Sequence, residues 1–485
     1  MDPLQKDKEM VRTVTVPASE TKADPLEKMP DPMEVPDGGF EAWRTVAGAW
    51  LVLLGTFGYS YTFGVYEDFY VREYLSNHTP SSIAQLSTND AFLSWAFCGE
   101  GFDDGGFHAI EIIGGIIFTF SVFMLSLAKP GQYYQIFLAQ GVGMGIGLGL
   151  TFLPTISIVV HHFKRRRGLT SGIVLSGSSV GATFFPIMLN HLLPKLGFAK
   201  AIRATGAIVP PCLVVGNLLM RTRLPPRSKR PNAKSPDIKS FFGDAAYMWG
   251  VVGTFVSLLG LYFPVIYIQL FSIQHNVDSK LAFYSVAMLN ASGAFVRILG
   301  NHLADLYGPF NVQMLCSFAA ARSSGRCSAF NVIMNSVSRH DGASLIVVSL
   351  LYGALSGAWL SLCFACFASL ARGPEKSGSN SPAPPHVEIT PVQSSARAGL
   401  ALALCSMGTL VSAPIQGALL TDRFVWLNPV GFAGVGVLRI LFVWWCVLTL
   451  GGTGDGVRWR VLFSGYTDLA RQGDGELEGV AQRLI

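Results

Sequence analysis

Long hydrophobic segments alternate with short polar segments along most of the chain. A helix needs about 20 consecutive apolar residues to cross roughly 30 Å of hydrocarbon, so each segment of that length predicts a membrane-spanning helix. A soluble α/β protein would instead alternate short β-rich runs with amphipathic helices. The clearest predicted spans are 44–66, 110–128, 133–160, 169–190, 199–220, 244–270, 281–303, 343–370, 399–421 and 430–450.

Two weaker segments, 83–101 and 312–336, complete a set of twelve predicted spans, which the basic segment 221–240 divides into six and six. The first holds only about a dozen residues between its acids, where about 20 are needed. The second is interrupted by charged and polar residues at 322–326 and 338–341. We therefore expect the second and ninth helices to be defective.

A Pro/Ser-rich insert at 377–392 also differs from the sequence on either side of it. The insert and the two defective spans have two explanations: they are real features of the protein, or they are errors of exon joining in the coding sequence. The damage is local and the neighbouring motifs are intact, which favours the second explanation.

Composition agrees with a membrane environment. Half of the residues (50%) are hydrophobic, 14% are charged, and the mean hydropathy is +0.41. A soluble protein of this length would need more charge to cover its surface. The first residues are charged and Pro-rich without an apolar core, which predicts a disordered tail.

The net charge is a modest +5, but basic residues cluster in two places, Lys164–Arg167 and 221–239. Basic clusters of this kind can bind nucleic acid, but both lie between long apolar segments. The excess of Lys and Arg in cytoplasmic loops of membrane proteins explains them better. The bilayer, and no nucleic acid, is therefore the expected partner.

This charge pattern predicts that both termini lie in the cytosol. We expect the protein in the plasma membrane, with a vacuolar or other organelle membrane as the alternative. The predicted parts are a disordered cytosolic tail (1–40), an N-terminal helix bundle (41–220), a basic cytoplasmic loop (221–242), a C-terminal helix bundle (243–450, with a loop insert at 371–398) and a cytosolic C-terminal tail (451–485).

Two long motifs lie at the mouths of predicted spans. The first is P-D-G-G-F-E-A-W at the mouth of the first span, with Asp37, Gly38, Gly39 and Trp43. The second is H-F-K-R-R-R-G-L-T-S-G at the start of the fifth span, with Lys164, Arg165, Arg166 and Gly172. Together they resemble signatures of the monocarboxylate-transporter-like branch of the major facilitator superfamily, and the segment 57–70 is similar to the fungal members of that branch.

The resemblance implies an all-α membrane protein with the major-facilitator fold, in which two six-helix bundles surround a central cavity that opens alternately to each side. It also implies symport of a monocarboxylate with a proton. Fungal members are diverse, so the substrate does not follow from membership.

Arg297 is the strongest candidate for substrate binding. A charge within a span costs roughly 2.5–3.5 kcal/mol on insertion scales, and such residues are usually functional. A guanidinium at this depth can hold a substrate carboxylate in a bidentate pair. The resemblance also places a substrate-binding arginine in this helix. The alternative is an arginine that extends to the inner interface.

The match to proton-coupled members is incomplete. Where they carry an aspartate, one turn before the arginine, this chain has Gly293. Where they carry a lysine in the first helix, it has Tyr61 or a neighbour. Proton coupling therefore depends on other residues or does not occur.

Three aromatic residues, Tyr61, Tyr267 and Trp359, are further candidates to line the cavity, although aromatic residues in membrane helices more often pack or lie at interfaces.

Asp103 and Asp305 follow the second and eighth spans in motifs similar to the superfamily's D-R-x-G gating motif. Neither copy keeps the arginine, so acidic turns without a gating role are the alternative.

These features predict a secondary active transporter of a small organic solute, with a monocarboxylate or related organic anion as the substrate class. The alternatives are a non-transporting membrane sensor on the same fold and an inactive variant. No catalytic cluster of His, Asp or Glu lies within a span, so we expect no enzyme activity, and we expect no cofactor or metal.

Overall fold

The computed structural model describes residues 37–75, 105–223, 238–261, 263–274, 277–325, 342–370 and 391–420, together with the isolated positions 77, 82–83, 86 and 432. Every regular element in these ranges is a helix. The predicted spans 83–101 and 430–450, the end of 312–336 and the insert at 377–392 lie largely or wholly outside them.

The N-terminal half begins with a helical run that is broken near its middle. Helix α1 (Phe40–Gly55) is followed by the single turn α2 (Phe57–Ser60), then by α3 (Phe63–Phe69) and the π-helix η1 (Tyr70–Tyr74). The elements that complete this half are α6 (Phe107–Leu125), α7 (Tyr133–Ile136), the π-helix η3 (Phe137–Gly143), α8 (Met144–Ser157), the 3₁₀-helix η4 (Ile158–His161), α9 (Arg167–Leu196), α10 (Phe198–Gly206) and α11 (Val209–Leu219).

The C-terminal half is helical throughout its described residues. Its elements are α12 (Ile238–Phe242), α13 (Ala245–Leu261), α14 (Phe263–Gln274), α15 (Ser279–Tyr307), α16 (Pro309–Gly325), α18 (Gly342–Leu370) and α19 (Pro391–Leu420).

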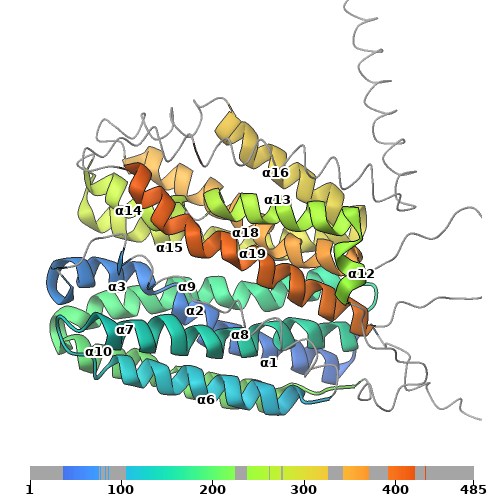
Figure 1. The fold of residues 1–485 in the computed structure, drawn as a ribbon, viewed down its shortest axis with the longest axis horizontal. Helices are drawn as coiled ribbons and strands as arrows, with labels where there is room; N and C mark the ends of the chain where they lie inside the picture. The colour runs from blue at the N-terminus through green and yellow to red at the C-terminus, as the bar shows by residue number, and fades with distance from the viewer. Residues whose placement is uncertain are drawn as a thin grey trace, which may run out of the picture. The chain divides into compact units, whose positions relative to one another are not determined.

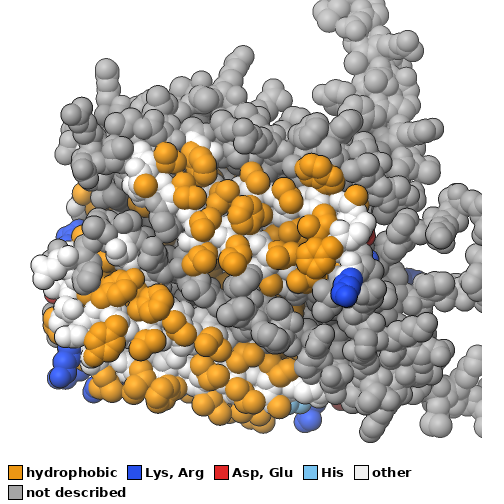
Figure 2. Space-filling model, viewed as in Figure 1, with side chains coloured by type: hydrophobic (Ala, Val, Ile, Leu, Met, Phe, Trp, Pro, Cys, Tyr) orange, Lys and Arg blue, Asp and Glu red, His pale blue; other side chains and the backbone are white. Residues whose placement is uncertain are grey.

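Among the described residues, eight helical segments are long and apolar enough to cross a membrane. They coincide with predicted spans, and α13 with α14 divides the predicted span 244–270 into two helices. Figure 2 shows hydrophobic side chains spread over the visible face of both halves, with Lys and Arg near its margins. On α6, for example, Ile116 is 63% and Phe120 is 61% exposed, which suits a surface that contacts lipid rather than water.

The two halves meet along α9 and α15, which lie next to each other between the remaining helices (Figure 1). Close approach of these backbones depends on small residues: a Cβ atom at Gly172 would lie 2.6 Å from the carbonyl oxygen of Arg297. Glycine therefore permits the contact, as is common between membrane helices, where no hydrophobic effect drives association.

Candidate functional site

A cavity lies between the two halves near the middle of α9 and α15. Its polar lining residues come from both halves and are Tyr61, Ser179, Asn290, Arg297 and Ser356. Its remaining walls are formed by glycines of α15 and α18 and by the apolar residues Leu261, Val265, Leu289 and Leu360. The arrangement combines one cation and several hydrogen-bonding groups with an apolar surface.

Arg297 is only 7% exposed and connects the two halves. Its Nη1 donates hydrogen bonds to the carbonyl oxygen of Leu175 (3.1 Å) and to Ser178 Oγ (2.6 Å), both on α9. Within the described residues, neither Nε nor Nη2 donates a hydrogen bond and no carboxylate pairs with the guanidinium. The Nε–Nη2 edge is the one that can pair side-on with a carboxylate.

Gly293, one turn before Arg297, also lines the cavity. A Cβ atom there would lie 3.1 Å from the carbonyl oxygen of Gly353, and a Cβ atom at Gly357 would lie 2.8 Å from the Cα of Gly293. A side chain at position 293 would therefore require α15 and α18 to shift apart slightly, so their close packing favours glycine at the position where the proton-coupled members carry an aspartate.

Tyr61 lies at the break in the first helical run, between α2 and α3, and lines the cavity. The other two aromatic candidates do not line it. Tyr267 lies on α14, with its hydroxyl 3.2 Å from where a Cβ of Gly417 would be. Trp359 is 3% exposed in the hydrophobic core of the C-terminal half, and its Nε1 donates to Ser317 Oγ at 3.1 Å.

The two signature motifs contact each other at one end of the helices. Asp37 Oδ1 accepts hydrogen bonds from the backbone N–H of Lys164 and from that of Arg165 (2.6 Å). The rings of Trp43 and Phe163 meet edge to face, with centroids 5.5 Å apart. Gly38 and Gly39 adopt φ values of 154° and 100°, which glycine accommodates without strain, so the chain can turn from Asp37 into α1.

We call this the basic end, because the side chains of Lys164, Arg165 and Arg166 are exposed there, and the backbone of Arg221 lies beside them. His162 connects the two basic segments through a 2.8 Å hydrogen bond from Nε2 to the Arg221 carbonyl oxygen. Burial lowers the pKa of His162, and the nearby Arg223 acts in the same direction against the effect of that hydrogen bond. The imidazole is therefore neutral in this setting.

Asp305 joins the two halves at the basic end. Its Oδ1 accepts from the N–H of Gly168 (2.7 Å) and its Oδ2 from the N–H of Leu169 (2.8 Å), so a carboxylate of α15 caps the N-terminus of α9. A Cβ atom at Gly168 would lie 2.4 Å from the carbonyl oxygen of Asn301. α9 and α15 are therefore in close contact at this end. Asp103, the other motif aspartate, lies outside the described residues.

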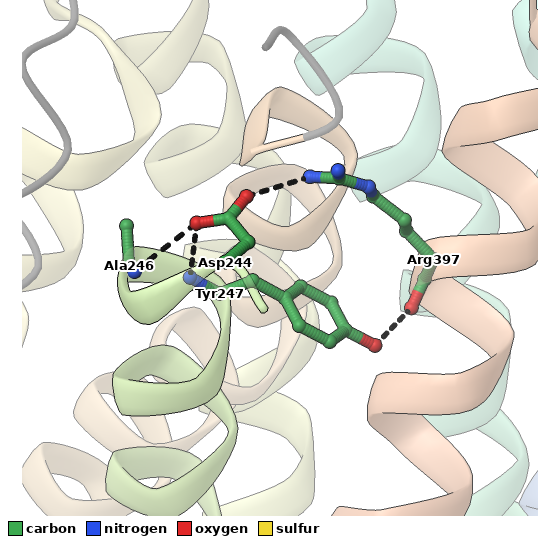
Figure 3. Close-up of polar contacts among 4 residues, drawn as sticks. All are labelled: Asp244, Ala246, Tyr247 and Arg397. Carbon is green, nitrogen blue, oxygen red and sulfur yellow. Dashed lines mark hydrogen bonds and ion pairs between the residues drawn. The ribbon is translucent and has the colours of Figure 1, made fainter. Parts of the chain in front are cut away.

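Sequence reasoning missed a third aspartate, Asp244 (Figure 3). It stands at the start of the C-terminal half, as Asp37 stands at the start of the N-terminal half. Asp244 Oδ1 caps α13 by accepting from the N–H of Ala246 (3.1 Å) and of Tyr247 (3.2 Å), and its Oδ2 pairs with Arg397 Nη1 at 3.0 Å. Tyr247 donates its hydroxyl to the Arg397 carbonyl oxygen at 3.0 Å. The signal was present in the sequence, because an aspartate precedes an aromatic residue by three positions at the start of both halves.

A helical membrane protein with a polar cavity between two halves, and with helix ends joined across them, has the architecture of a membrane transport protein. The chain belongs to the Major Facilitator Superfamily, whose family model matches residues 109–381.

Curated relatives and a solved structure agree with this assignment. The aspyridones efflux protein of Emericella nidulans is 31% identical over 460 residues, covering 93% of this chain and 88% of that protein. MFS-type transporter 1 of an Ophiocordyceps species is 31% identical over 392 residues, or 80% of each chain. The E. coli fucose:proton symporter shares the fold, with a TM-score of 0.58, 12% identity, and coverage of 84% of this chain and 98% of that one.

Membership makes the chain an integral, multi-pass membrane protein of a transporter family. The finer assignment to the monocarboxylate-transporter-like branch stays a prediction.

Proposed function

We propose that the protein is a secondary active transporter that exports an organic anion with an apolar body by alternating access. Arg297 carries this proposal, because it lines the cavity between the halves and has no carboxylate partner among the described residues. A buried guanidinium without a counterion is costly, and a substrate carboxylate would supply the missing charge.

The rest of the cavity supports the substrate class. Asn290, Ser179 and Ser356 offer neutral hydrogen-bonding groups beside Arg297, and Leu261, Val265, Leu289 and Leu360 offer an apolar wall. A small hydrophilic acid would leave that wall unused, whereas an acid with a hydrocarbon or aromatic body would cover it. Export is supported by the relative that is named as an efflux protein.

The hydrogen bonds of Arg297 to α9 suggest how binding leads to movement. A carboxylate that draws the guanidinium toward the cavity weakens its bonds to Leu175 and Ser178, which connect the halves. The substrate would then have different affinities for the two conformations, as any ligand that shifts such an equilibrium must.

Transport into inside-out vesicles tests the proposal. A panel should pair organic acids, from small to bulky and apolar, with their neutral amides. We expect saturable transport of an apolar acid and none of its amide. Arg297→Gln should reduce the rate at low substrate concentration at least about tenfold, since a hydrogen bond to a charged group contributes about 1.5–3 kcal/mol.

Arg203→Gln is the matched control, because Arg203 is an exposed arginine of α10 that donates to Ser126 Oγ away from the cavity. It should transport like the wild type. Equal transport of acid and amide, or an unchanged rate in Arg297→Gln, would contradict the proposal. Failure of every solute to move would favour the non-transporting sensor.

A further inference from the structure

Glu111 is the one acidic residue of the described ranges whose side chain is buried, at 3% exposure. It lies on α6, one turn after the helix begins at the basic end, within a segment long and apolar enough to span the membrane. Neither signature motif contains it, and the cavity is lined by other residues. An ionisable side chain inside the membrane is usually functional.

The surroundings of Glu111 suit a protonated carboxyl group. Its Oε1 lies 3.2 Å from Thr155 Oγ1 on α8, and its Oε2 is buried and has no hydrogen-bond partner among the described residues. The Thr155 hydroxyl has another acceptor, the Thr151 carbonyl oxygen at 2.6 Å. A neutral Glu111 can donate to Thr155, which donates to Thr151, whereas a carboxylate would be left with one weak donor in an apolar setting.

The other titratable groups around α6 do not neutralise a carboxylate at this position. His108, one turn earlier on α6, is bonded through Nδ1 to Asn217 of α11 at 2.8 Å. Arg203 of α10 is bonded to Ser126, just beyond the far end of α6, and Lys200 lies on the same short helix. Cys212 of α11 cannot supply a positive charge, and the described residues of η3 and α8 carry no titratable side chain.

Thr155 connects Glu111 to the contacts between the halves. It follows Pro154, which interrupts the backbone hydrogen bonds of α8, and the helix continues as the 3₁₀ turn η4. The chain then enters the loop whose amides at Lys164 and Arg165 bond to Asp37, and reaches Gly168 and Leu169, which bond to Asp305. A change in the hydrogen bonding of Thr155 can therefore shift the short, irregular backbone that leads to the start of α9.

We propose that Glu111 is a proton-binding site linked to closure of the basic end: a proton on Glu111 stabilises the conformation in which Asp305 caps α9, and opening of this end releases the proton to water. The idea rests on the proposed transport function, since it gives the conformational cycle a proton-dependent step. The closed conformation binds one proton more than the open one, so a rise in pH favours opening.

Hydrogen–deuterium exchange of the 162–170 backbone tests this without any substrate, because the Gly168 and Leu169 amides are protected only while Asp305 accepts from them. After correction for intrinsic exchange, wild-type protection should fall by up to about tenfold per pH unit above the midpoint. Glu111→Gln, which mimics the protonated acid and can still donate to Thr155, should stay protected at every pH.

Three further variants complete the experiment. His108→Asn and Glu73→Gln, the latter at an exposed acid of η1, should keep the wild-type pH response. Thr155→Val removes a hydroxyl that can accept from the neutral Glu111 and donate to the ionised one. The bond to the ionised form is the stronger of the two, so the midpoint should move to higher pH, which gives a second reading if Glu111→Gln folds poorly. Wild-type protection independent of pH, or a response lost in His108→Asn but kept in Glu111→Gln, would overturn the proposal.

Transport measurements separate this proposal from the proposed function. Glu111→Gln should retain exchange of substrate down its own gradient and lose accumulation driven by a pH gradient. If the wild type moves no solute while its amide protection responds to pH through Glu111, the proposed transport function fails and the proton site stands. If Glu111→Gln accumulates substrate as the wild type does, the proton site fails and the transport function stands.

Discussion

Arg297 and Glu111 show how a charged side chain in a membrane span is accommodated in two ways. Arg297 keeps its charge and distributes part of it over two acceptors on α9. Glu111 has a single weak donor, so neutralisation by a proton is the cheaper solution. A guanidinium cannot take that route, because it holds its proton at every physiological pH. The first residue therefore suits an anionic ligand and the second a proton.

Gly293 offers a test of why a carboxylate is missing from the cavity. Gly293→Asp would place its Cβ 3.1 Å from the Gly353 carbonyl oxygen and force α15 away from α18. Overpacking of this kind costs about 1–3 kcal/mol. We expect a lower midpoint of thermal unfolding in detergent and no gain of proton coupling.

Gly293→Ala is the companion variant, since it adds the Cβ without the charge. It should lose part of the same stability, and the remaining difference from Gly293→Asp then reports the cost of the carboxylate. An aspartate variant as stable as the wild type would show that α15 and α18 can separate at this point and that the steric explanation is wrong.

At the scale of helices, an aspartate stands at the start of each half and holds a second helix. Asp37 precedes α1 and binds backbone amides before α9, whereas Asp244 precedes α13 and binds the Arg397 side chain at the start of α19. The guanidinium of Arg397 also lies 4.7 Å from the ring centroid of Phe241, a cation–π contact. Each aspartate therefore joins the start of its half to a segment that is distant in the sequence.

The Asp244–Arg397 pair should contribute measurably to the stability of the C-terminal half. Both side chains are mostly buried, at 24% and 13% exposure, so solvent screening is limited. Asp244→Asn keeps an oxygen that can cap α13 and loses the ion pair, whereas Asp244→Ala loses both. We expect the alanine variant to be the less stable by about 1 kcal/mol, the usual contribution of an N-cap.

A double-mutant cycle with Arg397→Met isolates the pair itself. Unfolding in mixed micelles should give a coupling energy of about 0.5–3 kcal/mol between Asp244→Asn and Arg397→Met, as for residues in one ion-pair network. A coupling energy of zero would mean that the two side chains contribute independently and that the cap alone explains the effect of Asp244.

At the scale of the molecule, hydropathy predicted the eight membrane-length helices of the described residues, because the bilayer imposes one length and one polarity on every crossing helix. The signature motifs drew attention to Asp37 and to the segment 162–172 separately. The sequence did not reveal that Asp37 and Lys164 touch, since that contact depends on how α1 and α9 pack. Trp359 was expected in the cavity, but burial in the core looks the same as cavity lining in a hydrophobic pattern. Glu111 was overlooked because a single acid near the start of a span resembles an interfacial residue.

Asp305 joins the two halves at the basic end, and in the proposed alternating-access cycle this contact would break when that end opens. The carboxylate uses one oxygen for each of two amides and adds a favourable charge at the N-terminus of α9. Asp305→Asn retains one acceptor, and its amide group cannot accept from the second N–H. The closed conformation should lose about 1–2 kcal/mol, which corresponds to a roughly 5–30-fold larger ratio of open to closed molecules.

Spin labels on cysteines at Arg166 and Leu306, both exposed at this end, report the separation of α9 and α15 in a background without native cysteines. The Asp305→Asn distance distribution should gain a longer component. Asp278→Asn is the matched control, because it makes the same substitution at the other end of α15, where Asp278 is exposed and forms no side-chain cap. A longer component in both variants, or in neither, would show that the carboxylate of Asp305 does not hold the halves together, and closure would then depend on the glycine-mediated packing of α9 against α15 alone.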